Sequence, residues 1–440
     1  MQQHLVRAAL AALLLAGAPA FAGAETIAIT GGDVHPVSSA AIPGGTVLIR
    51  NGRIVAVGAH IAIPAGARII DARGKMVTPG FINAETQLGL VEVGGERPTR
   101  NSSAVGVVNA GFRPWEGFNS TSAYIASTRE DGITSVGVFP TGGFISGQAA
   151  VVDLAAGTGA EMLLRGPIGV VATLQTNAGR GGDVDEQTAG DVNTAGDDMA
   201  PASRGEAVGR LREIFDDVRF FARNRNGYDR AATRPLGASR AALEALRAVA
   251  EGRLPLFLHA NRVDDIDAAV RLAGANHIKL VITGGAEAWR IAGRLAAAHV
   301  PVITGAMNNI PTSFDTLAQR QENAGLLRRA GVEVALVGNA GGGDEDAFNA
   351  RNVRYEAGNA VAYGMNREDA LRAVTLGAAR ILGVADHIGA LAPGLDANVV
   401  VWSGDPFEFA TAPEHVLVRG REYHDRSRQD ILTERYAKRR

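Results

Sequence analysis

The chain has 440 residues, 46% apolar and 20% charged, which is the composition of an ordinary globular protein too long for one small domain. Its 44 basic residues nearly balance its 46 acidic residues, so the net charge of −2 gives no footprint for nucleic acid. It has no cysteine, which excludes disulfides, cysteine-ligated zinc and a thiol nucleophile.

Residues 1–24 have the pattern of a secretory signal. Arg7 supplies the charged start, residues 8–16 form a short apolar run, and residues 20–24 hold two small-x-small cleavage sites. The apolar run is too short to cross a bilayer, although an N-terminal membrane anchor is the alternative. We therefore expect export to the periplasm and no membrane contact after cleavage.

Short β-like segments follow between residues 25 and 78, and Asn51-Gly52 marks a hairpin turn between two of them. Segments of the same character return at the C-terminal end, in residues 385–440. Neither set is large enough to bury a face alone. We therefore expect both chain ends to build one small β-sandwich, with residues 25–78 as its first part and residues 385–440 as its second part and tail.

Residues 79–384 alternate between strands and helices about every 25 residues, as in consecutive parallel βαβ units. The clearest predicted strands are 255–259, 278–283, 301–304 and 332–337, and the clearest predicted helices are 204–224, 239–251, 264–272, 286–298, 313–329 and 366–382. About eight such units predict a (β/α)8 barrel, with an open doubly wound sheet as the alternative.

The stretch 177–201 is rich in Gly, Asp, Asn and Thr and should be a long loop, either a cover for the barrel mouth or a segment without a role. In a parallel barrel, reactive groups lie where strands end and loops begin. The polar and glycine positions at the predicted strand ends are Glu85, Gln87, His259, Asn261, Gly284 and Asn339. This set holds one imidazole and one carboxylate, and its other members are neutral.

Several motifs resemble those of the amidohydrolase superfamily, in particular its imidazolonepropionase-like and prolidase-like secreted members. They include Gly74–Asn83, Asp131–Val136, His259–Ile266 and the closing segments Ala373–Gly383 and Gly389–Trp402. The resemblance covers nearly the whole mature chain. It implies a (β/α)8 barrel with a catalytic zinc or another divalent metal, and hydrolysis of C–N bonds in small amides, cyclic amides or dipeptide-like substrates.

The family's metal-binding positions carry other residues here, with one exception. His259 matches the fifth-strand histidine, whereas the matched positions of the other ligands are occupied by Glu85, Gln87, Asn261, Gly284 and Asn339. Catalytic zinc needs three good protein ligands to lower the pKa of its bound water to about 7. We therefore expect no family-type metal and no other cofactor.

Individual residues keep two interpretations each. His259 either packs as a strand-end histidine or contacts a ligand, and Glu85 either pairs with an arginine such as Arg262 or acts as a metal-free acid or base. His259 and Glu85 are the candidate catalytic residues. Asp264-Asp265 should cap a helix N-terminus. Residues 344–346, after three glycines, form either a solvated loop or a replacement cation site.

Two functions remain open. The resemblance implies a C–N hydrolase, whose metal is absent or held unconventionally. The replaced ligands instead favour a non-catalytic relative that binds a small molecule in the barrel mouth, either as a homo-oligomer or as the partner subunit of an intact paralogue.

Overall fold

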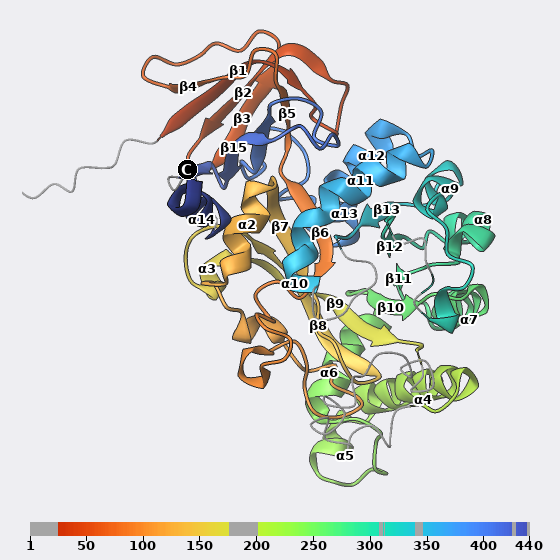
Figure 1. Cartoon of the computed structure of the whole chain (residues 1–440). Helices are drawn as coiled ribbons and strands as arrows, with labels where there is room; N and C mark the ends of the chain where they lie inside the picture. Colours follow the sequence, from red (N-terminus) through yellow and green to blue (C-terminus); the bar gives the residue numbers. More distant parts are fainter. Residues whose placement is uncertain are drawn as a thin grey trace, which may run out of the picture.

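The computed structural model describes residues 25–175, 201–307, 311, 313–338, 346–424 and 428–437. The signal-like segment 1–24, almost all of the stretch 177–201, and Asn339 lie outside the described residues. Two eight-stranded sheets organise the chain, one built from both chain ends and one from the middle (Figure 1).

The central sheet is a nearly closed barrel whose strands are hydrogen-bonded in chain order. At the seam the first and last strands are neighbours, because the Gly338 amide donates to Asn83 Oδ1 at 3.4 Å. The strands are β6 (Phe81–Thr86), β7 (Ile133–Val138), β8 (Ile145–Asp153), β9 (Leu163–Thr173), β10 (Leu256–Ala260), β11 (Leu280–Gly284), β12 (Val302–Thr304) and β13 (Val334–Leu336).

The prediction of an all-parallel barrel is wrong at β8, which runs antiparallel to both β7 and β9. A parallel connection needs a dozen or more residues, usually including a helix. Only residues 139–144 separate β7 from β8, and Gly142 and Gly143 turn the chain there with φ of 77° and 69°. The short link therefore forces a hairpin in place of a βαβ unit.

The barrel interior is filled by side chains. Phe139 and Phe257 meet edge to face with ring centroids 5.0 Å apart, and α13 (Leu376–Ile381) contributes buried side chains to the same cluster. The inward-facing strand residues of this cluster include Ile82, Ala84, Val151, Val171, Val281, Ile303 and Ala335. Because the interior is packed, a ligand site has to lie at the strand ends.

Helices surround the barrel where the sequence predicted them, with three breaks. The predicted helix 286–298 begins as a 3-10 turn, Ala288–Ile291, which is followed by α8. The predicted helix 313–329 is a short 3-10 turn, Phe314–Thr316, followed by α9, and the predicted helix 366–382 divides into α12 and α13. The break between α12 and α13 lies where the chain bonds to the barrel, because the backbone amide of Ile82 in β6 donates to the carbonyl of Val374. Ser313 and Asn366, the first residues of the predicted segments 313–329 and 366–382, cap the turns that follow them.

The larger helices are α2 (Ala123–Glu130), α4 (Arg204–Arg223), α6 (Arg240–Ala250), α7 (Val263–Asn276), α8 (Ala292–Ala297), α9 (Asn323–Arg329), α11 (Val353–Ala362), α12 (Arg367–Ala373) and α14 (Arg428–Ala437). Shorter ones are α3 (Gly159–Met162), α5 (Arg225–Asp229) and α10 (Asp346–Asn349). None of the helices in the described part of the chain combines the length and apolar character needed to cross a bilayer.

The second sheet joins the two chain ends at β5, which pairs antiparallel with β14 and parallel with β1. Its strands are β1 (Thr26–Val34), β2 (Ile42–Arg50), β3 (Arg53–Gly58), β4 (Arg68–Asp71), β5 (Met76–Pro79), β14 (Val399–Trp402), β15 (Pro413–Val418) and β16 (Arg421–Tyr423). The two ends also share one apolar core. The sandwich form of this unit stays a prediction.

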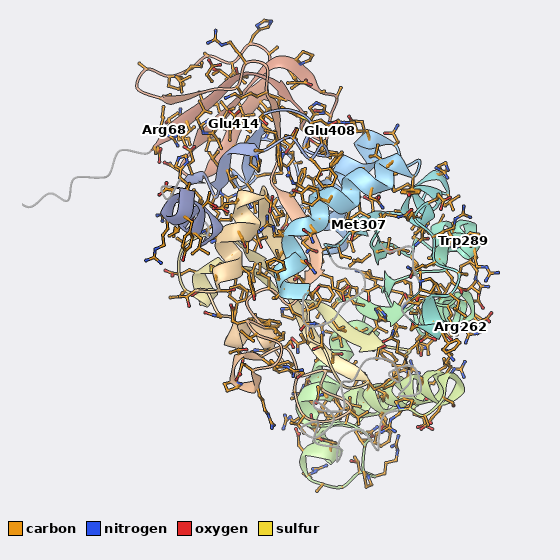
Figure 2. The ribbon with its side chains drawn as sticks, viewed as in Figure 1. Arg68, Arg262, Trp289, Met307, Glu408 and Glu414 are labelled. Atoms are coloured by element: carbon orange, nitrogen blue, oxygen red, sulfur yellow. The ribbon has the colours of Figure 1, made fainter. Side chains whose placement is uncertain are left out.

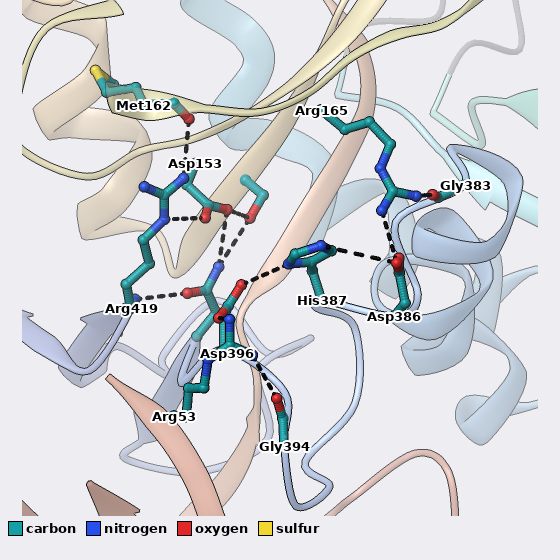
Figure 3. Close-up of polar contacts among 12 residues, drawn as sticks. Arg53, Asp153, Met162, Arg165, Gly383, Asp386, His387, Gly394, Asp396 and Arg419 are labelled. Atoms are coloured by element: carbon teal, nitrogen blue, oxygen red, sulfur yellow. Dashed lines mark hydrogen bonds and ion pairs between the residues drawn. The ribbon is translucent and has the colours of Figure 1, made fainter. Parts of the chain in front are cut away.

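A buried polar cluster connects this sheet to the barrel (Figure 3). Arg419 Nε donates to Asp153 Oδ2 at 2.7 Å, and Asn398 Nδ2 donates to Asp153 Oδ1 at 3.1 Å. Ser135 Oγ donates to the same carboxylate at 2.6 Å. We call Ser135, Asp153, Asn398 and Arg419 the junction cluster.

Candidate functional site

At the end of β6, two carboxyl groups come together. Asp346, the first residue of α10, accepts hydrogen bonds from Thr86 Oγ1 at 3.0 Å and from the Gln87 amide at 2.5 Å. Burial raises the pKa of Asp346 to about 6, against the effect of these two donors. Asp346 therefore fixes α10 against the strand end that carries Glu85 and Gln87. Residues 344 and 345 of the predicted cation site lie outside the described residues.

Glu85 is half-buried beside Asp346. Burial, followed by the negative charge of Asp346, raises the pKa of Glu85 to about 8. At neutral pH its side chain is therefore mainly the uncharged acid, which can donate a hydrogen bond. The predicted pair with Arg262 is wrong, because within the described residues Arg262 forms its ion pair with Asp264, at 4.0 Å.

His259, at the end of β10, uses both ring nitrogens inside the protein. Its Nε2 lies 3.2 Å from Asn261 Nδ2, and its Nδ1 lies 3.2 Å from Thr283 Oγ1. The amide can only donate, so we assign a neutral ring that accepts at Nε2 and donates from Nδ1. Burial lowers the pKa of His259, against the opposing charge of Asp315, in agreement with this neutral form.

Asn261 links the ends of β10 and β11. Its Oδ1 accepts from the Ala286 amide at 3.2 Å, while its Nδ2 donates to His259. Gly284 has φ of 81°, and a Cβ there would lie 2.6 Å from Asn261 Oδ1 and 2.8 Å from His259 Cε1. The Asn261 and His259 side chains thus occupy the space that a side chain at position 284 would need.

These residues do not fit a family-type metal. The His259 lone pair is engaged by Asn261, Gly284 has no side chain, and Gln87 offers only a neutral amide. Among the described residues, no group of three or more His, Cys, Asp or Glu side chains is arranged to hold a metal ion. The donor set therefore falls short of the three ligands that catalytic zinc uses.

Glu287 performs the role that was predicted for Asp264 and Asp265, and that prediction is wrong. The Glu287 carboxylate accepts from the Val263 amide, at the first position of α7, at 3.0 Å. Asp264 and Asp265 lie in the first turn without a side-chain cap, and Asp265 pairs with Arg204 at 3.0 Å. An acid from the next loop of the barrel thus caps the helix.

Glu356 was missed by the sequence reasoning. It lies on α11, and its carboxylate accepts from the Ala306 and Met307 amides, 2.5 and 2.7 Å away, just after β12. Burial raises the pKa of Glu356 to about 7, against these two donors. Its position within a helix carried no motif, and only the packing of α11 against the barrel reveals it.

Comparison with known proteins gives one consistent result. The amidohydrolase family model matches residues 76–423. An imidazolonepropionase of Klebsiella pneumoniae is 26% identical over 412 residues, spanning 85% of this chain and 90% of the relative. The amidohydrolase tasK of Hapsidospora irregularis is 23% identical over 404 residues, which are 86% of this chain but 39% of that protein. The crystal structure of an amidohydrolase from Thermotoga maritima superposes with a TM-score of 0.78 at 28% identity, covering 91% of this chain and 100% of the other.

Proposed function

The chain belongs to the amidohydrolase family, and from this premise we propose that its barrel binds a small molecule without a family-type metal. On this proposal the chain alone does not hydrolyse C–N bonds by the family's metal-dependent route. The observation that carries it is the engagement of both His259 ring nitrogens by Asn261 and Thr283.

A metal ion would compete with the Asn261 side chain for the His259 ring. A metal at His259 Nε2 would first require the Asn261 amide to turn away. That movement would also remove the acceptor of the half-buried Ala286 amide, and an unpaired donor costs up to about 1–3 kcal/mol when it is buried. Metal binding by the neutral amides at positions 87 and 261 would offset little of this free energy, since zinc prefers imidazole, thiolate and carboxylate ligands.

Metal analysis tests the proposal directly. The protein is purified without a metal-binding tag, incubated with equimolar Zn²⁺, Mn²⁺ or Fe²⁺, desalted and measured by elemental analysis. We expect far less than one equivalent of each metal, and no metal-stimulated hydrolysis of imidazolonepropionate or a proline dipeptide. One tightly bound equivalent that disappears in His259→Ala would overturn the proposal.

A second candidate function is metal-independent hydrolysis by Glu85 and Asp346, and their two perturbed carboxyls favour it. Asp346 as carboxylate would accept a proton from the attacking water while that water's oxygen bonds to the amide carbon. Glu85 as acid would donate its proton to the leaving nitrogen as the C–N bond breaks. Such acid–base assistance contributes about 10²–10⁴-fold, so Glu85→Gln should reduce any metal-free hydrolysis by that factor.

We also propose that the barrel can act as the partner subunit of an intact paralogue. A barrel that binds a small molecule but holds no metal could still contribute a binding surface to an assembly, and assembly of related chains is common. Co-expression with such a paralogue, followed by size-exclusion chromatography and activity measurements, tests this. Independent elution and an unchanged activity of the paralogue would contradict it.

Export is a further proposal, which rests on the signal-like pattern of residues 1–24. Mass spectrometry of the N-terminus after expression of the full chain tests it. We expect the mature chain to begin after residue 22 or 24 and to appear in the periplasmic fraction. A full-length chain in the membrane fraction would favour the anchor instead.

A further inference from the structure

A cavity of about 380 Å³ lies on the rim of the barrel, beside the site already described. Residues that follow β10, β11 and β12 line it: Arg262, Val263, Asp264, Glu287, Arg290, Phe314 and Leu317. Glu85, His259 and Asn261 do not line this cavity. Its volume falls within the range of small-molecule sites, which is about 300–1,000 Å³.

One wall of the cavity is apolar and unusually exposed. Phe314 is 87% exposed and Leu317 is 62% exposed, and both belong to the segment at the 3-10 turn that precedes α9. Single exposed apolar residues are common on protein surfaces and need no explanation. Two large ones three residues apart, lining the same cavity, present a surface that an apolar group would cover favourably.

The lining also carries two guanidinium groups with weak partners. Within the described residues, Arg262 forms its ion pair with the exposed Asp264, which also lines the cavity, at 4.0 Å. Arg290 lies 3.4 Å from Glu287, whose carboxylate already accepts from the Val263 amide. Figure 2 labels Arg262 and Trp289, the neighbour of Arg290, on the side of the barrel formed by α7 and α8.

Arg204 provides a comparison, because its guanidinium group is paired with two carboxylates. It pairs with Asp265 at 3.0 Å and also with Asp315, so its charge is matched on two sides. In the part of the chain that the structure describes, the ion pairs of Arg262 and Arg290 are no shorter than 3.4 Å, and their guanidinium groups carry N–H donors in a planar fork. This fork matches the geometry of a carboxylate, which it can bind through two parallel hydrogen bonds.

We propose that this rim cavity binds a small amphipathic carboxylate. Its carboxylate is held by Arg262 and Arg290, and its apolar body lies against Phe314 and Leu317. This proposal does not depend on whether the barrel mouth binds metal, because none of its lining groups belongs to the candidate metal positions.

Titration calorimetry of the mature chain with phenylbutyrate tests the proposal, with phenylbutyramide as the neutral probe of matched shape. Exposed sites of this kind bind weakly, so we expect a Kd on the order of 1 mM for phenylbutyrate and at least about tenfold weaker binding of the amide. The double variant Arg262→Gln/Arg290→Gln should weaken phenylbutyrate binding at least about tenfold, and Phe314→Ser about fivefold.

Arg253→Gln is the matched control, because Arg253 pairs with Glu251 on the exposed surface away from the cavity. This variant should bind phenylbutyrate like the parent chain. Circular dichroism and thermal unfolding check that each variant is folded. The proposal is overturned by an absence of saturable binding, by equal affinity for the amide, or by unchanged affinity in the double arginine variant.

Discussion

The junction cluster and the barrel mouth both bury carboxyl groups, but the two regions differ in whether a cation accompanies the buried carboxyl. At the junction, burial raises the pKa of Asp153, but Arg419, Ser135 and Asn398 all stabilise its charge. At the mouth, burial raises the pKa values of Glu85, Glu356 and Asp346 to about 8, about 7 and about 6. Among the described residues, no arginine, lysine or histidine forms an ion pair with any of these three.

The difference separates a structural cluster from a candidate functional one. A buried carboxylate with its cation and hydrogen-bond donors holds two elements in one geometry, although it adds little net stability. Buried carboxyls without a cation reduce stability at neutral pH, because the fold disfavours their charged form. Groups of this kind occur preferentially where a protein contacts a ligand. The carboxyl groups at the mouth are therefore the better candidates for contact with a ligand.

The largest effect should come from breaking the junction. Arg419→Met leaves the Asp153 carboxylate buried without its cation, which typically costs about 3–5 kcal/mol of unfolding free energy. Urea denaturation followed by circular dichroism measures it. Arg73→Met is the control, since Arg73 and its partner Asp71 are both exposed, and a much smaller loss is expected there. Equal losses of unfolding free energy in the two variants would show that the Arg419–Asp153 pair contributes no more than an exposed ion pair.

The second effect is a pH-dependent gain at the mouth. The folded pKa of Glu85, about 8, lies above its usual 4.5, so the folded state holds this proton more tightly and stability falls as pH rises between these values. Glu85→Gln removes this dependence, and should raise the unfolding free energy by roughly a few kcal/mol at pH 9 with little change at pH 4.5.

Urea denaturation at several pH values measures this gain. Glu116→Gln, at an exposed position, should leave the pH profile of stability unchanged. A Glu85→Gln profile parallel to that of the parent chain would show that Glu85 is charged and well solvated in the folded protein.

The third effect concerns the link between Asn261 and His259. Asn261→Leu removes the donor to His259 Nε2 and the acceptor of the Ala286 amide, so we expect a loss of about 1–3 kcal/mol. The same change removes a hydrogen bond to the neutral ring, so the pKa of His259 should rise. NMR titration of the ring measures this, and an unchanged pKa would place the Asn261 amide elsewhere in solution.

The smallest effect tests the cap of α7. Glu287→Gln weakens the bond to the Val263 amide and should cost about 0.5–1 kcal/mol, whereas Asp264→Asn should change stability by less than about 0.5 kcal/mol. Thermal unfolding of both variants compares them. A larger cost for Asp264→Asn would restore the cap that the sequence predicted.

The sequence by itself determined the family, the barrel and the strand-end positions of Glu85, His259, Asn261 and Gly284. These features follow from local patterns, because strand periodicity and motif spacing fix which residues stand at each strand end. The helix caps at Ser313 and Asn366 are local in the same sense. The antiparallel β8 is the exception, because the regular strand–helix repeat predicts a parallel unit there, whereas the short Gly142-Gly143 link forms a hairpin.

Only the tertiary structure decided which partners these residues have. Asp346 reaches Thr86 across 260 residues of sequence, and Glu356 reaches Ala306 across 50, so no local pattern could connect them. The same holds for Glu287 at the start of α7 and for Arg419 at Asp153. Since desolvation and charge depend on what surrounds a group in space, only the folded chain separates the paired carboxylate of the junction from the unpaired carboxyls of the mouth.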